Sequence, residues 1–197
     1  MIILASQSPA RSAMLTAAGV GHEALPARID EDGVTAALRA EAASPERITD
    51  ALAELKALKI SRSHPGVLVL GADSVAVADD GSLLAKPETA PRAAVQLRQL
   101  SGTTHRLISA AVIALNGTAI WRAGGAAKLT MRALSDEFIA DYLAREGAAV
   151  LACVGCYRIE GLGAQLFTRV EGDQFTIRGL PLLALLDYLR TRGELMA

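Results

Sequence analysis

The chain has 197 residues, which is enough for one domain, or two lobes around a cleft, with a full hydrophobic core. Its 20 Lys and Arg are balanced by 21 Asp and Glu, so no excess positive charge is available to hold nucleic acid or an acidic membrane. The longest uncharged apolar run, 107–115, is far shorter than the roughly 20 residues of a membrane-spanning helix. The N-terminal MIILASQSP lacks a basic segment and has too short an apolar run for a signal peptide, so we expect a soluble, cytoplasmic protein.

The first half of the chain predicts strands that alternate with helices. Ser8-Pro9 is typical of a helix N-cap followed by proline at the first helical position. The spacing of Leu52, Leu55 and Leu58 predicts an amphipathic helix. The expected elements are a strand over 1–5, a helix over 9–18, an acidic loop over 28–33, a helix over 45–61, a strand over 67–70, a hairpin of 74–78 and 82–84, and a helix over 90–100.

The second half continues the alternation and closes with a helix. Ser135, followed by Glu137, predicts a helix start, and Gly147 lies near the end of that helix. The expected elements are strands over 106–115 and 119–131, the helix from Ser135, strands over 157–159, 164–169 and 174–178, and a helix over 181–192. Without an internal repeat or a linker, residues 1–197 are predicted to form a single mixed α/β domain.

A phosphate site is one interpretation of the segment from Ser6 to Arg11. A strand ends there and a helix begins, so backbone N–H groups and the positive end of the helix dipole face outward together. The hydroxyls of Ser6 and Ser8 and the guanidinium of Arg11 would add donors. The alternative is an ordinary capped helix that carries a solvated arginine.

Three further charged residues are candidates for chemistry. Asp73 follows the apolar run 67–70, and ligands of open α/β sheets bind at such strand ends, although a turn aspartate is the alternative. Lys86 precedes Pro87, which stiffens the loop that carries the ammonium group. Lys56 lies at the margin of an apolar helix face, where its charge can reach over the core edge. Either lysine is otherwise a surface charge.

An acidic run, Asp30-Glu31-Asp32, offers oxygen ligands for a hard divalent cation, or is simply hydrated. Cations, helix-end donors, carboxylates for magnesium and one carboxylate that takes a proton from water are together what phosphoanhydride cleavage requires. A P-loop is excluded because G-x-x-x-x-G-K-[ST] does not occur.

The pair Cys153 and Cys156 has a spacing shared by redox motifs and half zinc sites. A second cysteine pair, which a zinc site would need, is lacking. Gly155 and the residues after Cys156 indicate a loop that enters a strand, whereas a redox motif starts a helix. We therefore expect two small apolar residues in a packed turn.

At these residues the chain resembles the Maf family of nucleoside triphosphate pyrophosphatases, from about Ile3 to Arg192. Seven blocks occur in the family's order: LASQSPAR (4–11), IDE (29–31), GADSV (71–75), AKP (85–87), LSGTTH (100–105), EGLG (160–163) and GLP (179–181). The resemblance implies an elongated mixed-sheet α/β fold related to inosine triphosphatases, with two lobes around a central nucleotide cleft. It also implies a divalent metal cofactor, Mg²⁺ or else Mn²⁺ or Co²⁺, and a homodimer.

The resemblance assigns roles position by position. Asp73 matches the family's proposed general base and would also bind the metal. Lys56 and Lys86 match lysines that contact the phosphates. Ser6, Ser8 and Arg11 match the phosphate-binding entry loop, and either Asp30 or Glu31 stands where the family has an acidic residue for metal or water positioning.

Departures from the family pattern concern the base of the nucleotide. Ala10 replaces the first of two arginines, and Ser74 and Glu160 stand where members that act on thymidine and uridine triphosphates have Thr and Gln. An ionised carboxylate only accepts hydrogen bonds, so Glu160 suits the N1–H and N2 amino group of guanine, unless it is a surface glutamate in a Gly-rich turn. In this respect the chain is similar to the 7-methyl-GTP pyrophosphatase branch.

The leading hypothesis is hydrolysis of a nucleoside triphosphate to a monophosphate and pyrophosphate, which removes modified or surplus nucleotides. Asp73 would act as the base, with Lys56, Lys86 and Arg11 on the phosphates and Ser74 and Glu160 at the nucleoside. The alternative is a nucleotide-binding regulator of cell division or septum formation that works without turnover. A thiol-redox protein is the third hypothesis.

Overall fold

The computed structural model describes residues 1–196 as a mixed α/β protein. In this range the strands are β1 (Ile2–Leu4), β2 (His22–Ala24), β3 (Val69–Val77), β4 (Leu83–Leu84), β5 (Thr104–Leu115), β6 (Thr118–Met131) and β7 (Phe167–Glu171). The helices are α1 (Pro9–Ala17), α2 (Glu31–Ala40), α3 (Pro45–Ser61), α4 (Ala90–Leu100), α5 (Asp136–Glu146), α6 (Gln174–Ile177) and α7 (Leu182–Thr191), with 3-10 helices η1 (Gly147–Val150) and η2 (Leu162–Leu166). The strands form one mixed sheet in the order β2-β1-β3-β5-β6-β7, with β4 paired to β3.

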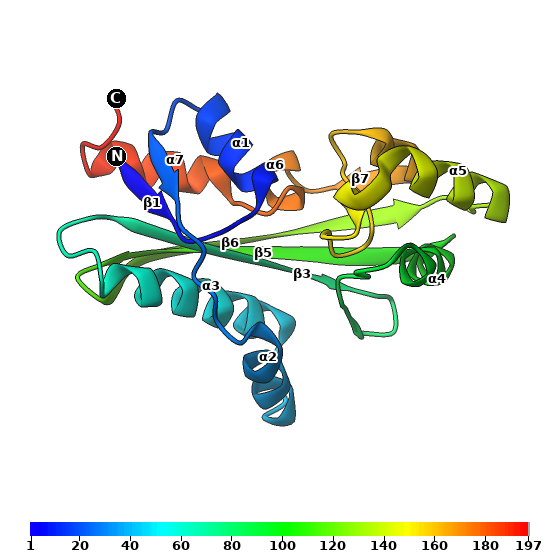
Figure 1. The fold of residues 1–197 in the computed structure, drawn as a ribbon, viewed down its shortest axis with the longest axis horizontal. Helices are drawn as coiled ribbons and strands as arrows, with labels where there is room; N and C mark the ends of the chain where they lie inside the picture. Colours follow the sequence, from blue (N-terminus) through cyan, green and yellow to red (C-terminus); the bar gives the residue numbers. More distant parts are fainter. Residues whose placement is uncertain (197) are drawn as a thin grey trace. The chain divides into compact units, whose positions relative to one another are not determined.

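Unit 1 is a compact part of the chain formed by residues 1–74, 108–125 and the C-terminal part from Arg178. Its strands β2, β1 and β3 are parallel, and Leu4, the last residue of β1, pairs with Leu70 of β3. Helix α3 covers one face of these strands, and α1 and α7 cover the other (Figure 1). Because β1 ends opposite Leu70 whereas β3 continues, the next residues of β3 lie beside the loop that leads into α1.

Helix starts in unit 1 follow local capping chemistry. The Ser8 hydroxyl accepts a hydrogen bond from the Arg11 N–H, and Pro9 occupies the first helical position of α1. Ser44 and Pro45 repeat this arrangement at the start of α3. The predicted helices over 9–18 and 45–61 are therefore confirmed to within one residue.

Unit 2 consists of residues 75–107 and 126–177 and has its own hydrophobic core. Helices α4 and α5 pack against each other, and Arg98 and Asp136 pair between them with Nε–Oδ1 of 2.6 Å. Tyr142 of α5 is buried, and its hydroxyl donates to the Cys156 carbonyl oxygen. Strand β7 runs antiparallel to β6, with a register shift at Thr130/Met131.

Three predicted elements are wrong in detail. No strand forms over 157–159, and 164–169 contains the end of η2 and only the start of β7. The predicted strand over 174–178 is the short helix α6, because both Asp173 oxygens accept bonds from the N–H and hydroxyl of Thr176 and cap a turn. A local side-chain cap therefore prevails over an alternating apolar pattern.

Three further differences concern the first half of the chain. The acidic segment over 28–33 is not all loop, since α2 starts at Glu31 with Asp30 as its N-cap. The short strand β2 pairs with β1 although its sequence, His-Glu-Ala, gives no apolar signal. The predicted strands over 67–70 and 74–78 overlap the single strand β3, which runs from Val69 to Val77.

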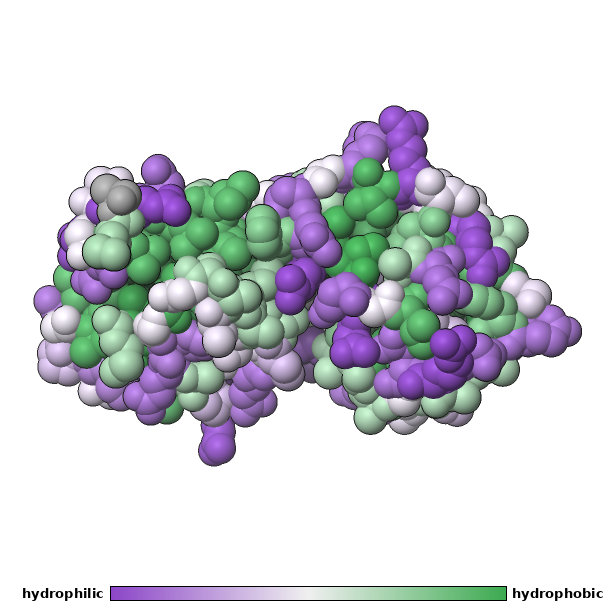
Figure 2. Space-filling model, turned by 90° about the horizontal axis from the view of Figure 1, so that it is seen from above, coloured by the Kyte–Doolittle hydropathy of each residue, from purple (hydrophilic) through white to green (hydrophobic). Residues whose placement is uncertain are grey.

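The surface of unit 1 carries exposed apolar side chains on the face with α1 and α7. Leu183 of α7 is exposed, and Trp121 of β6 stacks on Tyr188 of α7 with ring centroids 5.0 Å apart. Figure 2 looks onto this face and shows hydrophobic atoms gathered there among polar ones. None of the helices among residues 1–196 is long and apolar enough to cross a bilayer.

Candidate functional site

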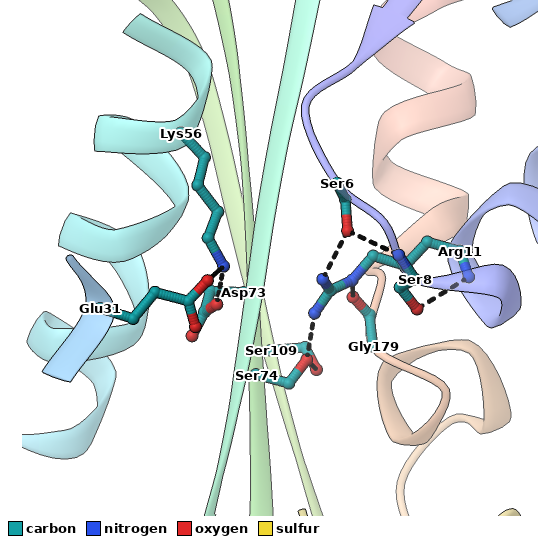
Figure 3. Close-up of polar contacts among 9 residues, drawn as sticks. All are labelled: Ser6, Ser8, Arg11, Glu31, Lys56, Asp73, Ser74, Ser109 and Gly179. Atoms are coloured by element: carbon teal, nitrogen blue, oxygen red, sulfur yellow. Dashed lines mark hydrogen bonds and ion pairs between the residues drawn. The ribbon is translucent and has the colours of Figure 1, made fainter. Parts of the chain in front are cut away.

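Asp73 and Ser74 are consecutive residues of β3, so their side chains leave the strand on opposite sides. Figure 3 shows Asp73 directed toward Lys56 of α3, and Ser74 directed toward Arg11 of α1. Both side chains belong to unit 1 and lie beyond the point where β1 ends. The site therefore consists of two clusters, one on each side of β3.

The carboxylate cluster comprises Glu31, Lys56 and Asp73. The Lys56 Nζ lies 2.5 Å from Asp73 Oδ1 and 2.7 Å from Glu31 Oε1. The Lys56 and Asp73 side chains are each 9% exposed, whereas Glu31 is 41% exposed. One lysine against two carboxylates leaves a net negative charge, which favours a bound cation.

The donor set of this cluster fits a hard divalent ion. Carboxylate oxygens are the ligands that Mg²⁺ prefers, and this ion usually keeps several waters and substrate oxygens as its other ligands. Within residues 1–196 no three His, Cys, Asp or Glu side chains are grouped as a ready metal cage. Glu31 and Asp73 could therefore hold Mg²⁺ together with water and a phosphate.

Gly71 explains how α3 brings Lys56 to Asp73. A Cβ at Gly71 would lie 2.1 Å from the Ala53 carbonyl oxygen and 2.6 Å from the Ala57 N. Only glycine permits this close approach of the α3 backbone to β3. Lys56 lies beside Ala57 on α3, so the same approach carries its side chain to the strand.

The structure distinguishes the two acidic residues at the start of α2. Asp30 Oδ1 accepts the Gly33 N–H at 2.9 Å and caps the helix, whereas Glu31 reaches Lys56. The chain before them is held by Lys59, whose Nζ donates to the Arg28 carbonyl oxygen at 2.6 Å. Arg28 has a φ of 46°, a strained conformation for a residue with a side chain. Of these two acidic residues, only Glu31 belongs to the carboxylate cluster, and Asp30 remains a predicted metal ligand.

The arginine cluster lies on the other side of β3 and comprises Ser6, Arg11, Ser74, Ser109 and Gly179. The buried Arg11 guanidinium donates from Nε to the Gly179 carbonyl oxygen at 2.7 Å, from Nη1 to Ser6 Oγ at 3.1 Å and from Nη2 to Ser74 Oγ at 3.0 Å. Ser74 and Ser109 hydroxyls lie 2.8 Å apart. All these acceptors are neutral, so the cluster keeps a net positive charge.

Burial is the largest influence on the Arg11 guanidinium and lowers its pKa, while the charges of Asp73 and Glu31 oppose that shift. The three hydrogen bonds use three of its five N–H groups. The Ser6 hydroxyl also accepts the Ser8 N–H at 3.2 Å, which shapes the loop before α1. A preorganised cation with donor capacity at a helix start is suited to a phosphate.

Sequence reasoning gave Gly179 and Ser109 no role. Gly179 has a φ of 100°, and a Cβ there would lie 3.2 Å from Arg11 Nε, so glycine is required beside the guanidinium. No local pattern at 179–181 indicated this role, because the need for glycine arises from the distant Arg11 side chain. Ser109 lies within an apolar strand and offered no signal.

The remaining predicted site residues lie in unit 2. Lys86 is exposed between β4 and α4, and Glu160 is exposed in the segment before η2. Each is on a connecting segment, where binding residues are common. Their roles stay predictions.

The two cysteines behave as packed residues. The Cys156 thiol donates to Gln96 Oε1 at 2.7 Å, and burial raises its pKa to about 12. Burial also raises the pKa of Cys153, whose thiol donates to the Ala149 carbonyl oxygen. Thiols that stay protonated are poor nucleophiles, which agrees with a packed turn and disfavours redox chemistry.

A parallel βαβ arrangement with two clusters of opposite charge beside one strand defines an α/β protein whose ligands would lie at the carboxyl ends of its strands. Over residues 1–192 the chain matches the family described as Maf-like protein, and it belongs to that family.

Relatives match along nearly the whole chain. A nucleoside triphosphate pyrophosphatase of Sphingopyxis alaskensis is 57% identical over 98% of this chain and 97% of its own length. A protein of the same description from Caulobacter vibrioides is 48% identical over 98% of this chain and 96% of its own. A 7-methyl-GTP pyrophosphatase of Mesorhizobium japonicum is 50% identical, over 98% and 97% respectively. The predicted family is thus confirmed.

Proposed function

We propose that this enzyme hydrolyses nucleoside triphosphates between the α and β phosphates and releases a nucleoside monophosphate and pyrophosphate. The observation that carries the proposal is the pair of oppositely charged clusters formed around Asp73 and Ser74, consecutive residues of β3. Relatives that match along nearly the full chain bear the name nucleoside triphosphate pyrophosphatase. The role in the cell is removal of modified or surplus nucleotides.

Asp73 is the proposed general base. Its Oδ1 is bound to Lys56, so Oδ2 can accept the proton of a water molecule. The water oxygen attacks the α-phosphorus, the bond from that phosphorus to the oxygen bridging to the β-phosphate breaks, and pyrophosphate leaves. The proton ends on Asp73.

The other side chains hold the substrate and its charge. Glu31 and Asp73 would hold Mg²⁺, with Mn²⁺ or Co²⁺ as substitutes. The ion, when bound, neutralises phosphate charge and polarises the P–O bond. Lys56, Lys86 and Arg11 stabilise negative charge on the phosphates, and Ser6 and Ser8 orient them. Asp30 supports this arrangement through the start of α2.

The proposal also specifies which nucleotide base the enzyme prefers. Glu160 accepts hydrogen bonds from N1–H and the amino group of guanine, which favours guanosine nucleotides, including 7-methyl-GTP, over those of uracil and thymine. A relative 50% identical to this chain bears the name 7-methyl-GTP pyrophosphatase. On the family resemblance alone we also propose a homodimer, and we separately propose a cytoplasmic location.

The test is a release assay for pyrophosphate with purified protein, Mg²⁺ and normal and methylated nucleoside triphosphates. We expect pyrophosphate and monophosphate in equal amounts, with 7-methyl-GTP or GTP cleaved faster than UTP. The variant Asp73→Asn keeps the size of the side chain and removes its basicity, so it should lose turnover. Absence of cleavage, or full activity of Asp73→Asn, would overturn the proposal.

A further inference from the structure

Glu146 is a charged side chain buried at the end of α5, outside both clusters of unit 1. Its side chain is 2% exposed. Its Oε2 accepts bonds from Arg158, with Nε at 2.9 Å and Nη2 at 2.8 Å, and its Oε1 accepts the Leu162 N–H at 3.0 Å. A buried carboxylate with these three charge-assisted bonds is held in one position.

The two partners of Glu146 stand on either side of Glu160. Arg158 precedes Glu160 by two residues and Leu162 follows it by two, so one carboxylate anchors both ends of the segment 158–162, here called the Glu160 loop. Within the loop the Gly161 N–H donates to the Arg158 carbonyl oxygen at 3.1 Å. The loop is therefore a tight turn tied to the end of α5.

Glycines make this turn possible. A Cβ at Gly163 would lie 2.4 Å from the Arg158 carbonyl oxygen, and one at Gly161 would lie 3.1 Å from Glu146 Oε1. Only small residues allow the loop to fold back on Arg158 and approach the carboxylate. The block EGLG thus has a structural reason for both of its glycines.

Two carboxylates influence the Arg158 guanidinium to different extents. Its hydrogen bond and ion pair with Glu146 raise its pKa most, and the charge of Glu160 adds a smaller contribution. The Arg158 side chain is 41% exposed, so it could turn if its partner were lost. Both the Nε and Nη2 groups of Arg158 are bound to Glu146 Oε2, so this carboxylate fixes the guanidinium.

We propose that Glu146 is a positioning residue for recognition of the nucleotide base, because its carboxylate fixes the loop that presents Glu160. The inference rests on the proposed function, in which Glu160 accepts bonds from guanine. Glu146 contacts neither substrate nor reacting atoms. It acts through Arg158 and the Leu162 N–H.

The experiment measures binding without turnover. The full-length protein is titrated with guanosine and uridine 5′-(α,β-imido)triphosphate in the presence of Mg²⁺, and the ratio of the two dissociation constants is compared between variants. Glu146→Gln keeps the volume of the side chain but removes its charge. We expect the preference for guanosine to fall by about tenfold, the loss expected for a hydrogen bond to a charged group, while binding of the uridine compound stays constant.

The matched control is Asp141→Asn on the same helix. Asp141 forms an exposed ion pair with Arg145, with Oδ2–Nη1 of 3.3 Å, and should leave the ratio unchanged. Arg158→Gln removes the other half of the Glu146 pair from a half-exposed position, and it should reproduce the loss even where Glu146→Gln fails to fold. The double variant should lose no more than the larger single loss, because both changes break one ion pair.

A second readout follows the loop itself. Hydrogen exchange of the Leu162 amide should become at least about tenfold faster in Glu146→Gln, because its carboxylate acceptor is lost. An unchanged base preference, equal weakening of both nucleotides, an absence of base preference in the wild type, or an unchanged Leu162 amide would each overturn the inference. A wild type that prefers the guanosine compound yet releases no pyrophosphate from GTP would refute the proposed function and leave the positioning role supported.

Discussion

The two sides of β3 differ in the sign of the charge they collect. On one side Asp73 joins Glu31 and Lys56, where carboxylates outnumber the lysine. On the other side Ser74 joins Arg11, whose hydrogen-bond acceptors there are hydroxyls and a carbonyl. Because side chains alternate along a strand, one step in sequence separates a cluster of net negative charge from one of net positive charge.

The two clusters also differ in how they are assembled. The carboxylate cluster depends on the close approach of α3 at Gly71 and on the start of α2. The arginine cluster depends on Gly179, a residue 168 positions from Arg11 in sequence. We infer that substitutions on the first side change metal binding and turnover, and that those on the second change phosphate affinity.

The largest effect is expected from Lys56→Met, which leaves Asp73 and Glu31 without the cation between them. Breaking such a buried pair should lower the free energy of unfolding by about 3 to 4 kcal/mol, and turnover by about 100-fold or more. Denaturant unfolding and pyrophosphate release measure the two losses. Lys59→Met on the same helix removes one bond to a carbonyl and should cost about 1 kcal/mol. Equal losses for Lys56→Met and Lys59→Met would contradict the role of Lys56 as the cation of a buried carboxylate cluster.

Low pH should destabilise the protein through a buried histidine of unit 2. Burial lowers the pKa of His105 from 6.5 to about 4, and its Nε2 lies 2.8 Å from the Tyr157 hydroxyl. The folded state therefore favours neutral imidazole, so this stability is present above pH 6.5 and is lost as the pH falls toward 4. The loss is about 3 kcal/mol.

The measurement is denaturant unfolding between pH 7 and pH 4, for the wild type and for His105→Gln. Between pH 7 and pH 4, the free energy of unfolding of the variant should fall by about 3 kcal/mol less than that of the wild type. An identical pH dependence in both proteins would show that His105 contributes nothing.

A smaller effect is expected from Glu31→Gln, which weakens a proposed carboxylate ligand for Mg²⁺. The concentration of Mg²⁺ that gives half-maximal activity should rise by about tenfold, within the range found when interactions at a metal site are lost. Asp30→Asn is the matched control, because asparagine still caps α2, and its Mg²⁺ requirement should stay the same. If Asp30→Asn raised the Mg²⁺ requirement more than Glu31→Gln did, Asp30 rather than Glu31 would be the metal ligand.

Local chemistry made part of the fold predictable from the sequence. Ser8-Pro9 and Ser135 mark the starts of α1 and α5, because a hydroxyl cap needs only its own helix. Asp30 and Asp173 form caps of the same kind. Because these caps were overlooked, a loop and a strand were wrongly predicted at these places. Caps are thus more informative than apolar alternation over short segments.

Long-range packing limited the prediction of the site. Charge and position in the sequence singled out Asp73, Lys56 and Arg11. Their arrangement on two sides of β3 could not be predicted, because it depends on β3 continuing beyond the end of β1. The Gly179 contact joins chain segments that no local pattern connects. Such contacts follow from the assembled fold rather than from neighbours in sequence.

The most direct test of the account compares Asp73→Asn with Ser74→Ala in steady-state hydrolysis of one nucleoside triphosphate. Asp73→Asn should lower kcat by about 10² to 10⁴-fold with a KM changed by only a few-fold, because a general base acts in the transition state. Ser74→Ala should raise KM and leave kcat within a few-fold, because it loosens the Arg11 donors that we propose bind phosphate. If both variants change the same kinetic parameter, the two sides of β3 do not have separate roles.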